Sequence, residues 1–133
     1  ESNPSDNIES SFYNIYPTDL LINFSQNLYG VYNADNLVET SNGNNYYFTA
    51  NNGIYRTNTS MSNVNLVIPI QSDVLDITTE KYVVNDSTDA YSNILYMNDL
   101  NNIGSIYKYN INLTTFVDTI SVNGQVLDIA FKN

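Results

Sequence analysis

Ile54-Tyr55-Arg56-Thr57-Asn58 returns 52 positions later as Ile106-Tyr107-Lys108-Tyr109-Asn110. Val74-Leu75-Asp76-Ile77 returns at the same spacing as Val126-Leu127-Asp128-Ile129, with no gap between the two matches. An internal period of this size indicates that one supersecondary unit is used more than once. The repeat therefore predicts how the chain is built.

The segments in and around the repeat have the composition of β-strands. β-branched residues, Tyr and Phe dominate the apolar positions, and no window keeps the 3.6-residue apolar period of a helix. Asn51-Asn52-Gly53 and Asn123-Gly124 predict hairpins, because Asn and Gly both adopt positive φ, and Asn42-Gly43 predicts a third turn. Short strands separated by regular turns predict an all-β fold.

The repeated unit is expected to be a four-stranded antiparallel meander. Its strands are predicted at residues 46–50, 54–58, 65–70 and 74–78 in the first copy, and at 94–97, 105–111, 116–122 and 125–131 in the second. Earlier strands are predicted at residues 12–16, 20–24, 28–32 and 37–40. We therefore expect one all-β domain over residues 12–133, with the repeat at about 46–79 and 94–131. The polar residues 1–11 are expected to form a flexible arm or a strand partner for something else.

Asn93-Ile94-Leu95-Tyr96-Met97-Asn98 and Ser105-Ile106-Tyr107-Lys108-Tyr109-Asn110 are similar to strand pairs of β-propeller blades of the YVTN or NHL-like surface kind. Residues 123–131 resemble the junction into a following blade, so the resemblance spans about residues 46–131. It implies propeller-type blades, but a closed propeller needs at least about four. Three architectures stay open: a β-sandwich, a piece of a longer propeller, and a ring assembled from several chains.

Composition restricts the function. The 133 residues include 4 basic and 14 acidic side chains, for a net charge of −10, so binding to nucleic acid is not expected. The absence of Cys and His removes the usual nucleophiles, general bases and zinc ligands, and we expect no enzymatic activity. No apolar run approaches the roughly 20 residues of a transmembrane helix. The chain begins at Glu1, which we expect to reflect a removed signal or excision from a longer protein.

Four sequons make Asn23, Asn58, Asn85 and Asn112 candidates for glycosylation. Asn23 lies in an apolar run and is expected to be partly buried. Asn58 and Asn112 are expected at similar places after a strand. In a chain this rich in Asn, Ser and Thr, several sequons also arise by chance. A surface that uses Asn, Ser, Thr and Tyr in place of Lys and Glu favours an extracellular, cell-surface or virion-surface location.

Two acidic features could carry chemistry. Asp86 and Asp89 lie in the acidic loop Asn85–Asn93, where oxygen ligands would suit Ca²⁺, although a solvated loop explains the same residues. No other cofactor is expected. Asp76 and Asp128 occupy equivalent positions of the repeat; we expect them to cap turns or accept backbone hydrogen bonds, and not to act as a catalytic pair.

Tyrosine supplies most of the aromatic area, with 12 residues. Tyr47, Tyr55, Tyr107 and Tyr109 are candidates for an exposed platform on which sugar rings stack, although packing in the core and rim of a sheet is the simpler explanation. Arg56 and Lys108 match between the two copies, and cation–π contact or protection of a sheet edge would explain them.

These observations favour a structural or adhesive subunit of an extracellular, cell-envelope or virion surface assembly, acting through sheet packing and strand-edge pairing. Its partners would be further copies of the chain or other surface proteins. The alternative is a lectin-like, glycan-binding module made of propeller-type blades.

Overall fold

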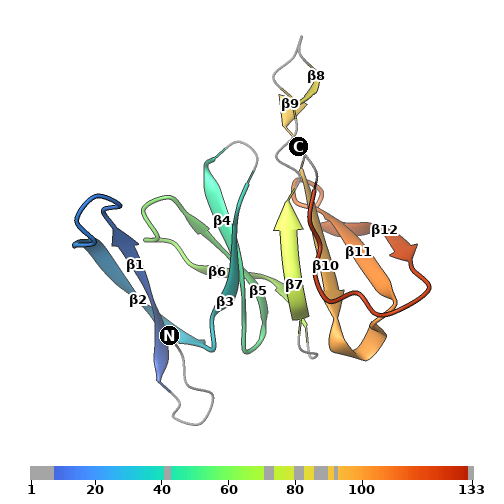
Figure 1. Ribbon diagram of the computed structural model, residues 1–133, viewed down its shortest axis with the longest axis horizontal. Helices are drawn as coiled ribbons and strands as arrows, with labels where there is room; N and C mark the ends of the chain where they lie inside the picture. The colour runs from blue at the N-terminus through green and yellow to red at the C-terminus, as the bar shows by residue number, and fades with distance from the viewer. Residues whose placement is uncertain are drawn as a thin grey trace.

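The computed structural model describes residues 8–40, 43–70, 74–79, 83–85, 90–91 and 93–131, and these form an all-β molecule (Figure 1). The strands are β1 (Glu9–Ile15), β2 (Ile22–Tyr32), β3 (Asp35–Glu39), β4 (Asn45–Ala50), β5 (Gly53–Asn58), β6 (Asn65–Pro69), β7 (Val74–Thr79), β8 (Val83–Asn85), β9 (Ala90–Tyr91), β10 (Ile94–Asp99), β11 (Ser105–Asn110) and β12 (Thr115–Ser121). A short 3-10 helix, η1 (Leu100–Asn102), joins β10 to β11. The helices described here include none long and apolar enough to cross a membrane.

Two four-stranded antiparallel sheets carry the repeat. The first sheet has the order β3-β4-β5-β6, and the second has the order β7-β10-β11-β12. Strands β1 and β2 form a separate two-stranded sheet, and β8 and β9 form another within the connection from β7 to β10. The predicted all-β meander, used twice, is therefore confirmed, and the described strands do not close into a barrel.

The predicted grouping of strands into sheets was wrong by one strand. Residues 74–78 were expected to complete the first sheet, but β7 pairs with β10 and begins the second sheet. The backbone keeps the period of the sequence. The N–H of Ile70 donates to the carbonyl of Asn52 at 3.1 Å, and one period later the N–H of Val122 donates to the carbonyl of Gly104 at 2.8 Å.

The hairpin predicted at Asn51-Asn52-Gly53 is confirmed, with a different centre. Ala50 pairs directly with Gly53, so the two turn residues are Asn51 and Asn52. The positive φ of 138° belongs to Gly53, the first residue of β5. Because only glycine adopts this conformation without strain, Gly53 fixes the start of the strand.

The second predicted hairpin, at Asn123-Gly124, is wrong. Residues 125–131 are not a strand paired with β12; they cross to a face of the second sheet, where the N–H of Val126 donates to the carbonyl of Ile103 at 2.7 Å. Gly124 still has a positive φ of 147°, because the chain must change direction there. The turn was recognised correctly, but the segment after it packs elsewhere.

The N-terminal part also differs from the prediction. Residues 9–11 belong to β1, so the expected arm does not extend through residue 11; residues 1–7 lie outside the described residues. The strands predicted at 20–24 and 28–32 form one strand, β2, which contains Gly30 at a φ of 74°. In Figure 1 the β1–β2 hairpin lies beside the first sheet, at one end of the molecule.

The first sheet is buried on both of its faces. Tyr47 and Ile54 face the second sheet in a cluster with Ile77, Leu95, Met97 and Tyr109. The next residues along the chain, Phe48 and Tyr55, face the other way and pack against Leu28 and Val31 of β2. Successive side chains of a strand point to opposite faces, so a sheet covered on both sides needs apolar residues at consecutive positions. This explains the unbroken apolar runs of β4 and β5.

Candidate functional site

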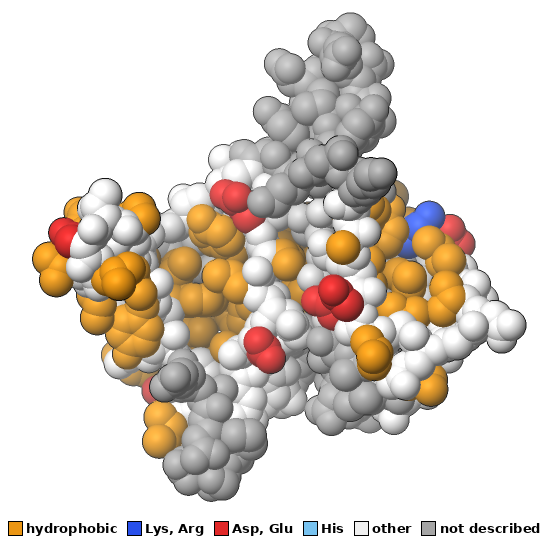
Figure 2. Space-filling model, in the orientation of Figure 1, with side chains coloured by type: hydrophobic (Ala, Val, Ile, Leu, Met, Phe, Trp, Pro, Cys, Tyr) orange, Lys and Arg blue, Asp and Glu red, His pale blue; other side chains and the backbone are white. Residues whose placement is uncertain are grey.

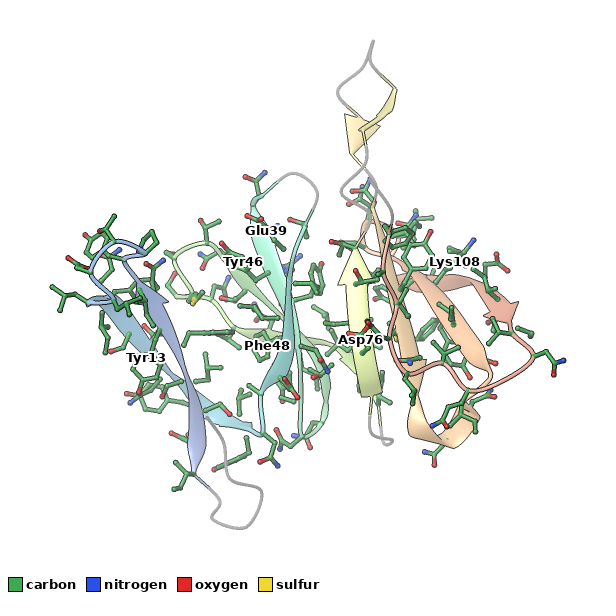
Figure 3. The ribbon with its side chains drawn as sticks, in the orientation of Figure 1. Tyr13, Glu39, Tyr46, Phe48, Asp76 and Lys108 are labelled. Carbon is green, nitrogen blue, oxygen red and sulfur yellow. The ribbon has the colours of Figure 1, made fainter. Side chains whose placement is uncertain are left out.

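Three segments that are far apart in the sequence meet near the middle of the molecule. They are residues 37–39 of β3, 78–79 of β7 and 129–131 after β12, and together they line a cavity of about 330 Å³. The hydroxyl of Thr79 donates to the carbonyl of Glu39 at 2.6 Å and joins the first two segments. Figure 3 shows Glu39 and Asp76 on these neighbouring strands, and Figure 2 shows acidic side chains gathered over the same region.

Residues 125–131 are attached to the outer face of the second sheet. The amide nitrogen of Asn98 donates to the carbonyl of Val126 at 2.8 Å. The ring of Phe131 makes an edge contact with Tyr96, with the centroids 4.9 Å apart. Tyr96 and Asn98 are two residues apart on β10, so they leave the strand on the same side. The segment thus covers the face opposite to the one that packs on the first sheet.

Asp76 and Asp128, the equivalent aspartates of the two repeats, come together at this place. Oδ2 of Asp76 accepts the N–H of Ile129 at 2.9 Å, and the two carboxyl groups are themselves in hydrogen-bond contact. Burial raises the pKa of Asp76, the N–H of Ile129 opposes this shift, and the neighbouring Asp128 raises the pKa further. Asp76 therefore does accept a backbone hydrogen bond, and it also lies beside a second acid.

We expect Asp128→Asn to stabilise the protein at pH 7 in the presence of a chelator. The pKa of Asp76 is higher in the folded protein than the ordinary Asp value of about 4. Its contribution to the free energy of unfolding is therefore fully present below about pH 4 and is lost as the pH rises through the folded-state pKa. The asparagine removes the like charge, and its amide can donate to Asp76. The gain should be roughly 1 kcal/mol or less, since the pair is partly exposed to solvent. Urea unfolding at pH 4 and at pH 7 measures it, with the gain confined to pH 7.

Asp118→Asn is the matched control, because the pKa of Asp118 is shifted in the opposite direction. The N–H of Thr119, and then Lys108 with its Nζ 3.2 Å from the carboxylate, hold the pKa of Asp118 below its usual range. Its contribution is present above the ordinary pKa and is lost as pH falls, so removing the charge should not stabilise the protein at pH 7. An equal gain for both variants would point to net charge as the cause.

The spacing of Asp76 and Asp128 does not suit glycoside hydrolysis. The two carboxyl groups of glycosidases stand about 5 Å or more apart, which leaves room for the sugar carbon or a water molecule between them. Carboxyl groups in hydrogen-bond contact are closer than that. Two apposed carboxylates repel each other unless a positive charge compensates for one of them.

The predicted exposed platform of tyrosines is wrong for three of its four members. Tyr47, Tyr55 and Tyr109 are buried, because both faces of the first sheet and the inner face of the second are covered. Tyr107 is half-buried, and its hydroxyl oxygen accepts the side-chain amide of Asn102 at 2.7 Å. Packing within the sheets accounts for these residues.

Arg56 and Lys108 take equivalent places on the third strand of each sheet. Arg56 pairs across the sheet with Tyr47; burial raises the pKa of Tyr47, and the positive charge of Arg56 opposes that shift. Lys108 pairs with Tyr96, and its Nζ lies 5.9 Å from the centre of that ring. The matched basic residues therefore each interact with a tyrosine on the neighbouring strand.

The structure separates the four sequons. Asn23 is exposed on β2, contrary to the expected burial, and its amide contacts Asn14 at 3.3 Å. Asn58 is half-buried, and its Oδ1 accepts the N–H of Ser62 at 3.0 Å. Asn112 is exposed in the turn between β11 and β12. Asn85 belongs to β8, but its side chain lies outside the described residues.

Asn58 does not correspond to Asn112. The residue one period after Asn58 is Asn110, whose Oδ1 accepts the N–H groups of Asn112 and Leu113 at 3.0 and 2.9 Å. Both Asn58 and Asn110 thus close the turn after the third strand of their sheet. This role explains why asparagine recurs at that position of the repeat.

The predicted calcium ligands Asp86 and Asp89 lie outside the described residues. In the described part of the chain, no group of three or more acidic side chains is arranged to hold a metal ion. Sequence reasoning also missed Asn98, which is enclosed beside the Asp76–Asp128 pair. Its position follows from the pairing of β7 with β10 and has no sequence signature of its own.

The fold defines a class of protein built from consecutive four-stranded antiparallel sheets. No family model matches the chain, and no curated protein matches it in sequence. Among solved structures, the chain is similar to a glutaminyl cyclase from Myxococcus xanthus, with a TM-score of 0.57 and 8% sequence identity. The match covers 85% of this chain and 43% of the cyclase chain. At this identity the likeness concerns the fold alone.

Proposed function

We propose that the protein is a structural or adhesive subunit of an extracellular, cell-envelope or virion surface assembly, and that it associates through the open edge of its second sheet. The observation that carries this proposal is the state of β12. This strand is the outer strand of its sheet, and all seven of its residues are exposed. The backbone groups on its outer side can pair with a strand from another molecule.

Strand β12 has few of the features that protect sheet edges from pairing. Natural edges are commonly blocked by proline, by charged side chains or by being short. Strand β12 contains no proline, and its charged residue, Asp118, is paired with Lys108 on β11. Phe116, Val117 and Ile120 are exposed on it. A second β-strand would cover part of this apolar surface while completing the hydrogen bonds of the edge.

The outer strand of the first sheet differs. Strand β6 has five residues, and it ends at Pro69, which has no N–H to donate. The two sheets are otherwise built alike, so the difference between their outer strands points to β12 as the associating edge.

The net charge of −10 makes association depend on salt. Copies of an acidic chain repel one another, and salt screens that repulsion over a distance of about 8–10 Å. Pairing through β12 should therefore strengthen as the ionic strength rises.

We expect Val117→Lys to weaken association without unfolding the protein. Val117 is 47% exposed, so the long side chain fits in solvent, but opposed lysines would meet in a paired edge. The association constant should fall roughly tenfold, which corresponds to about 1.4 kcal/mol. Light scattering after size exclusion in 0.5 M NaCl measures it as a shift toward the 15.0 kDa monomer.

The matched control is Leu66→Lys on β6, where the leucine is 43% exposed. It adds the same charge to the outer strand of the other sheet and should leave association unchanged. Equal weakening by both variants would assign the effect to net charge. A wild-type protein that stays monomeric at all salt concentrations would refute the proposal.

The burial of the predicted tyrosine platform removes one support for the alternative function, a glycan-binding module. A stacking platform needs exposed aromatic faces, and three of the four tyrosines considered for it are buried. We therefore propose the assembly function alone.

A further inference from the structure

The outer face of the second sheet carries three side-chain oxygen groups in one place. Asp76 on β7 is directly opposite Asn98 on β10, so both side chains leave the sheet on the same side. Residues 126–129 cover that side: Val126 accepts a hydrogen bond from Asn98, Ile129 donates one to Asp76, and Asp128 contacts the Asp76 carboxyl group. Two carboxyl groups and one amide are thus held between one sheet face and one segment.

The amide oxygen of Asn98 is an unsatisfied acceptor. Asn98 is 0% exposed, and its Oδ1 has no hydrogen-bond partner in the described structure. The bond from Nδ2 to the carbonyl of Val126 fixes which end of the amide is the nitrogen, so the free atom is an oxygen. A buried polar atom without a partner is costly and calls for a missing group, and an oxygen needs either a donor or a cation.

The two carboxyl groups also require a positively charged partner. Like charges in contact repel, and their apposition persists at neutral pH only if a proton or a cation compensates for one of them. Asp76 receives two backbone N–H groups, from Ile129 and Ile77, and no basic side chain is among the groups that influence it. A positive ion between the carboxylates would satisfy them and the amide oxygen together.

We propose that Asp76, Asp128 and the amide oxygen of Asn98 form a Ca²⁺ site that fastens residues 125–131 to the second sheet. Calcium prefers carboxylate and amide oxygens, and it accepts irregular geometry with water in the remaining positions. Asp128 is exposed, which leaves a route for the ion and its water. Magnesium is less suited because it requires a near-octahedral shell at short distances.

Few protein ligands imply weak binding. With two carboxylates and one amide, the dissociation constant should fall at about 10⁻⁴–10⁻³ M, the range of extracellular calcium modules. The site is separate from the β12 edge, so a test of Ca²⁺ binding does not depend on whether the proposed assembly function is correct.

The test is a thermal unfolding series at pH 7 on the full chain, first treated with EDTA and then titrated with CaCl₂ alone. At 10 mM Ca²⁺ the melting temperature should rise by roughly 5 °C or more. Asp128→Asn should fold, because the side chain is exposed and keeps its shape, and it should abolish most of this rise. Asp118→Asn removes the same charge from the surface of β12 and should keep the rise.

Two results would overturn the proposal. If Ca²⁺ has no effect at pH 7 while the EDTA-treated protein is stabilised as the pH falls toward 4, a shared proton compensates the pair and no cation is bound. If Ca²⁺ stabilises Asp128→Asn as much as the parent protein, the ion binds elsewhere. Isothermal titration with CaCl₂ separates the cases by stoichiometry, because the proposed site binds one ion per chain and loses it in Asp128→Asn.

Discussion

Gly53→Ala is expected to lower the free energy of unfolding by roughly 3–5 kcal/mol, or to prevent folding altogether. Gly53 has a φ of 138°, which an alanine adopts only with strain. A Cβ atom there would also overlap the carbonyl oxygen of Ile68 and lie 2.8 Å from the nitrogen of Ile70. These are backbone atoms of β6 and the residue after it, so they cannot move away without breaking the pairing of β5 with β6.

Gly124→Ala separates the cost of the backbone conformation from the cost of the steric overlap. Gly124 has a similar φ of 147°, but a Cβ atom there meets nothing within 4 Å. Its cost should be that of the conformation alone, about 1–2 kcal/mol. Urea unfolding followed by circular dichroism gives both values. Losses of the same size would show that the backbone conformation dominates and that the crowding at Gly53 is relieved by local movement.

Phe48→Ala is expected to cost about 3–5 kcal/mol, the usual range for a buried aromatic side chain. Phe48 is the centre of the cluster that joins the first sheet to the β1–β2 hairpin. Its ring stacks on Tyr55 with the centroids 5.5 Å apart, and it meets the edge of Phe12 at 5.1 Å. Figure 3 shows it on β4, between the hairpin and the second sheet.

Removal of Phe48 should therefore loosen the hairpin as well as lower stability. Limited proteolysis should cut near β1 and β2 at lower protease concentrations than in the parent protein. Tyr29→Ala is the control, since Tyr29 is 78% exposed on β2 and its loss should change stability by about 0.5 kcal/mol or less. A cost below about 1 kcal/mol for Phe48→Ala would show that the hairpin does not depend on this cluster.

The repeat predicts the length of the structural unit but not which strand begins it. Identical residues 52 positions apart show that a unit recurs, and they contain no information about which strand begins a sheet. That is decided by long-range pairing, here by the pairing of Asp76 on β7 with Asn98 on β10. Each predicted unit therefore began one strand too late, and in the second copy its fourth strand, at residues 125–131, does not form.

Turn chemistry is local, and this explains why one hairpin prediction succeeded and the other failed. Gly53 and Gly124 both follow an asparagine and both have positive φ. After Gly53 the chain returns along β4, whereas after Gly124 it crosses to a different face of the second sheet. A dipeptide can require a change of direction, but the surface on which the chain then packs is set by residues far away in the sequence.

The candidate site was only partly visible in the sequence. The repeat identifies Asp76 and Asp128 as equivalent, and equivalence predicts a shared local role such as accepting a backbone N–H. It does not predict contact, which arises because consecutive units place the same position side by side. The buried tyrosines have a related cause, because alternation of apolar and polar residues is lost in a sheet that is covered on both faces.

The hairpin of β8 and β9 has a consequence for engineering. Its two strands pair with each other, while the strands on either side of it, β7 and β10, are already joined by their own hydrogen bonds, and Figure 1 shows it projecting from the rest of the molecule. Lengthening a connection between strands that are held in place costs only about 0.6 kcal/mol for each doubling. This connection is therefore the natural point at which to graft an epitope, an affinity tag or a small reporter domain.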